Sequence, residues 1–293
     1  MRETLLKILE TGENTPAVDW LKKVIAEQTA DFQTRPFYYA FSGVSRHFDK
    51  RGTTSATDDQ LAALDQAAPG FTVDRWDQFR LARVILLTVL AEQPKDTFLE
   101  NLHALLSTAD IRETQAIYSA YPILPHPEDL IESAVDGLRT NIVEIYDSIA
   151  LDNPFPAAHF TEEQWNQMVL KALFIHRPLY RIKGIDDRPN PALTEAVVDL
   201  AHERWAAGRA INPEAWRCTV GNLNEAIESD LIKLIQSEDV RSIDLEAVAL
   251  VAKNDPNSTL GQNEDTIALQ FTAIEQGNLT WQTLGHHIEV NSQ

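Results

Sequence analysis

The stretch that decides the fold is NPFPAAHFTEEQWNQMVLKALFIHRPLYRIKG, residues 153–184. The prolines at its start predict a turn, because proline lacks the backbone N–H that a helix interior or a sheet needs. Thr161 is followed three residues later by Gln164, and this spacing is typical of a capping box at a helix start. Apolar side chains then recur at helical spacing as far as His176, which predicts an amphipathic helix.

The same helical spacing recurs along most of the chain. It is clear in RWDQFRLARVILLTVLAEQ (75–93), KDTFLENLHALLSTA (95–109) and NEAIESDLIKLIQS (224–237). Proline and glycine separate such segments, and no stretch alternates apolar and polar residues as a half-buried strand would. We therefore predict an all-α protein of roughly 14 helical segments joined by short loops.

Short loops between amphipathic helices make sequence neighbours antiparallel. A chain of 293 residues built in this way does not close easily into one bundle, whereas stacked helix pairs extend without limit. We expect an irregular, HEAT-like array of helical hairpins, similar to an α-solenoid. It would form one all-helical domain over residues 1–293, with an acidic helical segment at 221–293.

The formal net charge of −19 argues against whole classes of partner. An acidic surface repels phosphate backbones and anionic lipid headgroups, so we expect no nucleic-acid partner. Charge is nevertheless uneven, because residues 171–217 hold eight Lys or Arg and only six Asp or Glu. This basic island could steer an anionic or aromatic ligand, or it could pair with the acidic flanks.

The sequence also predicts where the protein works. Its N-terminus lacks the apolar core of a signal peptide, and the most apolar run, VILLTVL at 84–90, is far shorter than the ~20 residues that span a bilayer. We expect a cytoplasmic protein without direct membrane insertion. The one cysteine, Cys218, excludes an internal disulfide, and we interpret it as a buried structural thiol rather than a nucleophile.

The helix predicted over residues 161–176 supplies the first candidate site residues. One of its faces carries Trp165, Met168, Val169, Ala172, Leu173 and His176. We interpret that face as a core stripe whose terminal histidine is hydrogen-bonded. Asn166 and Lys171 lie beside the stripe and are better placed to contact a ligand.

A second helix, ALTEAVVDLAHERWAAGRA at 192–210, places Val198, His202, Trp205 and Arg209 on one face. His202 and Glu203 begin an HExxH motif, but alanine stands where the second zinc ligand is required, which excludes that metalloprotease motif. The linker before this helix carries Arg177, Arg181 and Arg188. These arginines could bind a ligand or form salt bridges with Asp186 and Asp187.

Specific enzyme motifs are missing from the sequence. It contains no GxSxG, no Walker loop and no GxGxxG, and Glu-x-x-His occurs once, at Glu100 and His103. We therefore expect no cofactor. A metal site assembled across helices from His159, Glu163, His176 and His202 remains an open alternative.

Three runs carry a family resemblance. The sequences at 141–174, 177–217 and 67–90, the last with its Pro-Gly pair, Trp76 and Arg83, resemble the EboA family of metabolite-traffic proteins over about residues 60–220. The resemblance implies encoding beside a membrane prenyltransferase-like protein and several enzymes. In cyanobacteria it also implies the movement of a secondary-metabolite precursor toward the periplasm. It supplies no catalytic residue. The residues that are candidates by pattern and chemistry together are Asn153, His159, Trp165, Asn166, Arg177, His202, Glu203, Arg204, Trp205 and Arg209.

The main hypothesis is a non-enzymatic scaffold or carrier in secondary-metabolite traffic. It would bind a small aromatic or prenylated metabolite, or a partner protein from the same gene cluster such as the membrane prenyltransferase-like protein. Trp165, His202, Trp205 and several arginines would face a shared hollow, since aromatic and arginine side chains bury a large area and still hydrogen-bond. The alternatives are a metal-dependent enzyme acting on that metabolite, and an adaptor whose acidic flanks bind a basic protein.

Overall fold

A computed structural model describes residues 1–11, 15–49, 52–256 and 258–291, excluding the side chains of residues 262–265. In these ranges the chain forms sixteen α-helices and five short 3-10 helices, and an isolated β-bridge joins Thr53 and Asp77. The predicted all-α class is confirmed, while the HEAT-like arrangement stays a prediction. No helix of the described part is long and apolar enough to cross a membrane.

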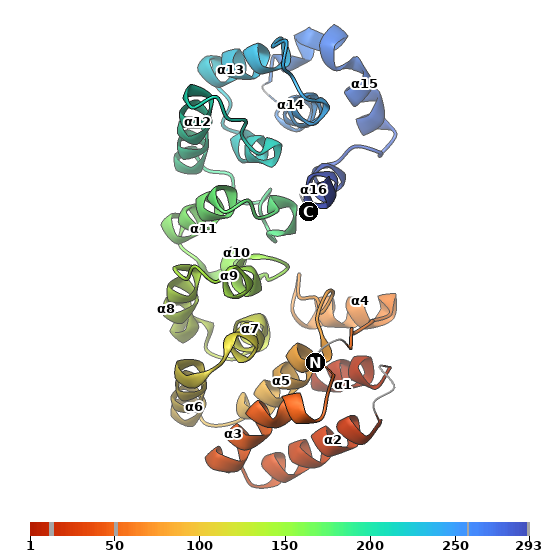
Figure 1. Cartoon of the computed structure of the whole chain (residues 1–293), viewed down its shortest axis with the longest axis vertical. Helices are drawn as coiled ribbons and strands as arrows, with labels where there is room; N and C mark the ends of the chain where they lie inside the picture. Colours follow the sequence, from red (N-terminus) through yellow and green to blue (C-terminus); the bar gives the residue numbers. More distant parts are fainter. Residues whose placement is uncertain (12–14, 50–51, 257, 292–293) are drawn as a thin grey trace. The chain divides into compact units, whose positions relative to one another are not determined.

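The chain folds into two compact units, Met1–Phe160 and Thr161–Gln293. The prediction of one domain over the whole chain stays a prediction. The first unit (red to yellow-green in Figure 1) contains α1 (Arg2–Glu10), α2 (Thr15–Ala30), α3 (Thr34–Gly43), η1 (Val44–Arg46), α4 (Asp58–Ala67), α5 (Gln78–Leu90), α6 (Lys95–Thr108), α7 (Ile111–Ala120), η2 (Tyr121–Ile123), α8 (Pro127–Leu138), α9 (Val143–Ala150) and α10 (Phe155–His159).

The most apolar run of the sequence becomes the centre of the first unit. Helix α5 packs against α1, α2 and α7, and α7 packs in turn against α9. Residues 84–87 and 89–90 of α5 are fully buried. A helix that is apolar nearly all round must lie inside the fold, because only there does each of its faces leave water.

The second unit (green to blue in Figure 1) contains α11 (Glu162–Phe174), η3 (Leu179–Arg181), α12 (Pro191–Ala206), η4 (Pro213–Thr219), α13 (Glu225–Ile235), α14 (Ser242–Asn254), η5 (Leu260–Asn263), α15 (Glu264–Glu275) and α16 (Trp281–Asn291). Helix α14 lies at its centre and contacts η4, α13, α15 and α16. The run at 247–251 on α14 is buried throughout.

Helix starts follow the capping residues of the sequence. The Thr161 hydroxyl accepts from the Gln164 backbone N–H at 3.3 Å, and the Gln164 side chain accepts from the Thr161 N–H at 3.0 Å, which confirms the capping box. Asn190 caps α12 through the Leu193 N–H at 2.9 Å, with Pro191 in the first turn. Both caps satisfy donors that the helix itself leaves unpaired.

One local prediction is wrong in detail. The segment after Asn153 was expected to be a turn, but residues 155–159 form the short helix α10. Pro154 stands at the cap and Pro156 lies in the first turn, where a helix has no use for the missing N–H. The prolines therefore end α9 and also permit a new helix at once.

Candidate functional site: a basic pocket in the second unit

A cavity of about 610 Å³ lies in the second unit where α11 and α12 end, α14 begins and the last turns of α16 pass. This volume is within the range of ~300–1,000 Å³ that is common for small-molecule sites. The lining consists of His176, Arg204, Ala210, Ile211, Asn212, Pro213, Arg241, Ile243, His287, Ile288 and Asn291. We call this cavity the basic pocket.

His176 reaches the pocket through an unusual helix ending. The Arg177 N–H donates to the Ala172 carbonyl at 2.7 Å and the His176 N–H to the Leu173 carbonyl at 3.3 Å, the two bonds of a Schellman motif. The residue after the helix cap in that motif adopts a left-handed conformation, and His176 has φ 56°. Glycine is usual there because a Cβ is strained at positive φ. The backbone of His176 is therefore strained at a residue that lines the pocket.

Helix α12 ends with the same motif. The Arg209 N–H donates to the Arg204 carbonyl at 2.8 Å and the Gly208 N–H to the Trp205 carbonyl at 2.9 Å, with Gly208 at φ 67°. This turn directs the following loop back over the helix end. The Arg204 side chain fixes the loop, because its Nε donates to the Ala210 carbonyl at 2.7 Å.

Arg241 is held in place at the start of α14. Its Nε and Nη2 donate to the two carboxylate oxygens of Asp244 at 2.7 and 2.6 Å, and Nη2 also donates to the Ile211 carbonyl at 3.0 Å. Asp244 is buried, so its charge needs this bidentate partner. The pair neutralises itself and orders the loop that carries Ile211.

The lining residue Pro213 is followed in η4 by Glu214, whose side chain is buried. The two oxygens of Glu214, in η4, accept from the backbone N–H groups of Leu179 at 3.0 Å and Tyr180 at 2.5 Å, in η3. Arg217 Nη1 also lies 3.4 Å from Glu214 Oε1. Burial outweighs these donors and raises the pKa of Glu214 to about 7.

Helix α16 is held against the same elements. Glu289 accepts from the Tyr180 hydroxyl and from Arg181 Nη1, the latter at 3.1 Å. At Gly285 the helix approaches η3 so closely that an added Cβ would lie 2.5 Å from Tyr180 Cδ1 and 2.7 Å from Glu214 Oε1. This contact sets the position of α16, and with it that of His287 and Ile288.

The charge of the lining is one-sided. Among the described residues it includes two arginines and two histidines but no aspartate or glutamate. Ile211, Ile243, Ile288 and Pro213 add apolar surface. Such a site can hold a small molecule by an electron-rich group at one end and by its apolar body at the other.

Of the ten sequence candidates, Arg204 alone is in the lining of the basic pocket. Arg177, next to His176, is partly exposed and gives its backbone N–H to the Schellman motif. Glu203 and Arg209 are exposed at the end of α12 and do not line the pocket. The other nine candidates lie outside this lining, and their predicted contacts with a ligand stay predictions.

The indole of Trp165 does not face outward, contrary to the expectation from the sequence. Its ring is fully buried, with Met168, Val169, Ala172 and Leu173 buried beside it. The core-stripe interpretation of that helix face is thus right for these five residues. His176 was expected to end the stripe in a hydrogen bond, but it is exposed at the turn. The left-handed turn at its own backbone explains the difference, because it carries the side chain off the core face.

Two candidate asparagines, Asn153 and Asn166, form hydrogen bonds within the protein. The Asn166 and Asn190 side-chain amides hydrogen-bond to each other at 3.0 and 2.9 Å, which joins α11 to the cap of α12. In the first unit, Asn153 is buried and donates to the carbonyls of Tyr118 and Ser148 at 3.1 and 2.8 Å. Both asparagines have structural partners for their amides.

His202 and Trp205 of α12 are not among the residues that line the basic pocket. His202 Nε2 is 2.6 Å from Asp230 Oδ2, and the Trp205 ring is 5.8 Å from the buried Trp216 ring. His159 belongs to the first unit, where its ring packs 4.8 Å from that of Phe155. These three candidates therefore have contacts of their own.

Two of the linker arginines contact residues of other elements in the second unit. Arg188 lies 4.7 Å over the Trp165 ring, and Arg181 pairs with Glu289. Asp186 pairs with Arg217 through two bonds of 2.8 and 2.6 Å. The pairing could not be read from the linker alone, because Arg217 and Glu289 belong to later elements.

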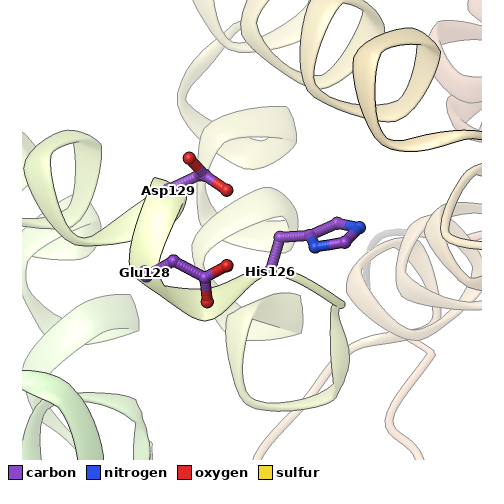
Figure 2. A group of neighbouring side chains, drawn as sticks. All are labelled: His126, Glu128 and Asp129. Carbon is purple, nitrogen blue, oxygen red and sulfur yellow. The ribbon is translucent and has the colours of Figure 1, made fainter.

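Within the second unit, Glu163, His176 and His202 do not come together as the alternative of a metal site would require, and His159 belongs to the first unit. Among the described residues, the one group of three or more suitable side chains within 4.8 Å is His126, Glu128 and Asp129, at the start of α8 (Figure 2). Lys95 Nζ lies 2.5 Å from Asp129 Oδ2 and 3.9 Å from Glu128 Oε1. A protein cation thus already compensates this charge.

Cys218 has the predicted structural role. It is buried, and burial raises the pKa of its thiol to about 12. A thiol that stays protonated is a poor nucleophile and a poor metal ligand.

Comparison with known proteins identifies the family of this chain. The chain matches neither a curated protein nor a solved structure. The family model described as "Metabolite traffic protein EboA" matches residues 1–220, which includes the first sixty residues that the sequence resemblance did not reach. Because this match covers most of the chain, the protein belongs to the EboA family of metabolite traffic proteins.

Proposed function

We propose that the protein is a non-enzymatic carrier that holds a small metabolite in the basic pocket during its traffic. The family description supplies the role in metabolite traffic. The observation that carries the proposal is the pocket itself, with a volume of about 610 Å³ and a lining of basic and apolar side chains. A cavity of this kind can bury most of a small molecule while a few polar groups fix its orientation.

The surrounding contacts support a preformed site. Arg204 is tied to the Ala210 carbonyl, Arg241 to Asp244, and α16 to η3 through Glu289. A preformed site loses little conformational entropy on binding, which favours affinity for a small ligand. The pocket is suited to holding a prenylated or otherwise largely apolar metabolite more than to stacking an aromatic one, since its lining in the described part of the chain has no aromatic ring except histidine.

The test is retention from an extract. The purified full-length protein is incubated with a small-molecule extract of the producing cells and separated from unbound molecules by gel filtration. It is then denatured, and the released compounds are identified by mass spectrometry. We expect one compound to be retained in proportion to protein and released chemically unchanged.

Matched variants locate the binding. Ile243→Asp should abolish retention, because it places a carboxylate among the apolar side chains of the lining at a partly exposed position. Ile232→Asp, a substitution on the partly exposed side of α13 away from the pocket, should retain as much as the unmodified protein. Recovery of a converted compound would contradict the carrier proposal in favour of an enzyme, and equal retention by both variants would move the site elsewhere.

A further inference from the structure

We propose that the basic pocket selects an amphiphilic acid, with its carboxylate or phosphate on Arg204 and the two histidines and its apolar body against the isoleucines. This inference deepens the proposed function and rests on it. It names the chemical class of the ligand, which neither the family description nor the sequence supplies.

The lining of the pocket contains hydrogen-bond donors that the described part of the chain leaves unused. Among the described residues, the Arg204 side chain makes one hydrogen bond, from Nε to the Ala210 carbonyl, and no ion pair. Its two Nη groups therefore keep their N–H donors for a ligand. A planar guanidinium with free Nη groups matches the spacing of carboxylate and phosphate oxygens.

His176 and His287 add further donors to the lining of the pocket. Within the described part of the chain, neither the His176 nor the His287 ring has a hydrogen bond, an ion pair or a ring contact. Each ring can donate an N–H to an oxygen whether it is neutral or protonated. His176 stands where a helix end favours glycine, and strain kept at a ligand-lining residue is common at binding sites.

The nearby carboxylates are already occupied. Asp244 is buried in its bidentate pair with Arg241, and Glu289 is held by Tyr180 and Arg181. Glu214 faces the backbone of η3 rather than the cavity. An incoming anion therefore meets Arg204 without a competing carboxylate among the residues that line the pocket.

A structural explanation of Arg204 accounts for only part of this arrangement. A cation in the last turn of a helix compensates the dipole, and Arg204 is such a residue in α12. That role needs no cavity and no second basic helix end. Here Arg204 shares one lining with His176, which follows the end of α11, and with His287 of α16.

The apolar side chains of the lining determine the rest of the ligand. Ile211 comes from the loop before η4, Ile243 from α14 and Ile288 from α16, and all three line the same cavity. A free inorganic anion would leave this surface in contact with water, whereas an alkyl or prenyl chain would cover it. The geometry thus favours a molecule with both an acid group and a hydrocarbon body over a small ion.

Four eight-carbon probes test the class of ligand by calorimetry on the full-length protein at about pH 7.5 and about 150 mM salt. Octanoate and octyl phosphate carry the acid, whereas 1-octanol and octylamine carry the same chain without it. We expect at least one acid to bind about tenfold more tightly than the alcohol, and the amine to bind more weakly than the alcohol. The tighter of the two acids identifies the head group.

The variants separate local contact from general charge. Arg204→Gln should lower acid affinity about tenfold, to the level of the alcohol, and leave alcohol binding unchanged. Arg209→Gln removes the same charge five residues further on, at an exposed side chain outside the lining, and should change neither. His287→Gln breaks no side-chain hydrogen bond or ion pair among the described residues and should weaken binding of the acid but not of the alcohol. It replaces Arg204→Gln as the test if that substitution loosens the loop.

Several results would overturn the inference. Equal affinity for acid and alcohol would show a ligand pocket without acid selection, and retention of an extract compound would then leave the carrier proposal standing. Equal losses in Arg204→Gln and Arg209→Gln would show that only long-range charge matters. Absence of acid binding up to about 1 mM would remove the amphiphilic acid as the ligand class.

Discussion

His176 and Gly208 occupy the same position of the same backbone motif, one at the end of α11 and the other at the end of α12. Both have positive φ, 56° for the histidine and 67° for the glycine. A left-handed residue with a Cβ costs roughly 1–2 kcal/mol, which glycine avoids at the expense of more chain entropy. We therefore expect the histidine at position 176 to give a lower free energy of unfolding than glycine would give at the same position.

The prediction at this scale is a trade between stability and binding. His176→Gly should raise the free energy of unfolding by about 0.5 kcal/mol, the net of strain relief and chain entropy, while it weakens octanoate or octyl phosphate binding. Gly208→Ala should lower the free energy of unfolding by about 1 kcal/mol, because nothing but the backbone opposes its Cβ. Urea unfolding measures both. A destabilised His176→Gly with intact acid binding would mean that His176 serves the fold.

Glu214 gives a second residue-scale prediction. Burial raises the pKa of Glu214 from 4.5 to about 7, so its stabilising contribution is complete below pH 4.5 and is lost as pH rises through about 7. That difference corresponds to about 3 kcal/mol. The free energy of unfolding of Glu214→Gln, relative to the unmodified protein, should therefore increase by about this amount between pH 4.5 and pH 8. A constant or falling difference would show that the η3 N–H groups and Arg217 keep Glu214 ionised.

At the scale of elements, capping residues and apolar spacing predicted much of what is observed. Thr161 and Asn190 begin the helices that their side chains cap, and the stripe through Trp165 is core. Spacing could not reveal the pocket, because His176 and His287 are more than a hundred residues apart in the sequence. The sequence pattern indicated aromatic residues as candidate ligand contacts. Large aromatic side chains are, however, more often buried in the core of a protein than exposed to a ligand.

The position of α16 leads to the element-scale prediction. Gly285→Ala should gain about 1 kcal/mol of helix propensity, but its Cβ would collide with Tyr180 and Glu214, so we expect a net loss of about 1–3 kcal/mol. Gly43→Ala, in α3 with nothing within 4 Å of the new Cβ, is the matched control and should not destabilise. Thermal unfolding compares them. A Gly285→Ala protein as stable as the control would show that α16 is not held by this contact.

At the scale of the whole molecule, the family match and the pocket do not coincide. The match covers residues 1–220, whereas Arg241, Ile243, His287, Ile288 and Asn291 lie beyond it. The acidic C-terminal segment thus completes the candidate site, and a basic lining stands out in a chain of net charge −19. The surrounding negative charge would discourage adventitious anions, so specificity for an acid must come from contacts inside the pocket.

The most direct test of the central claim is an experimental structure of the protein with the metabolite that it retains from the extract. We predict density for the bound metabolite between Arg204 and the isoleucines at 211, 243 and 288, with the electron-rich end of the molecule toward Arg204 and His287. Density at any other place, or an empty basic pocket in a protein that carries the metabolite, would contradict it.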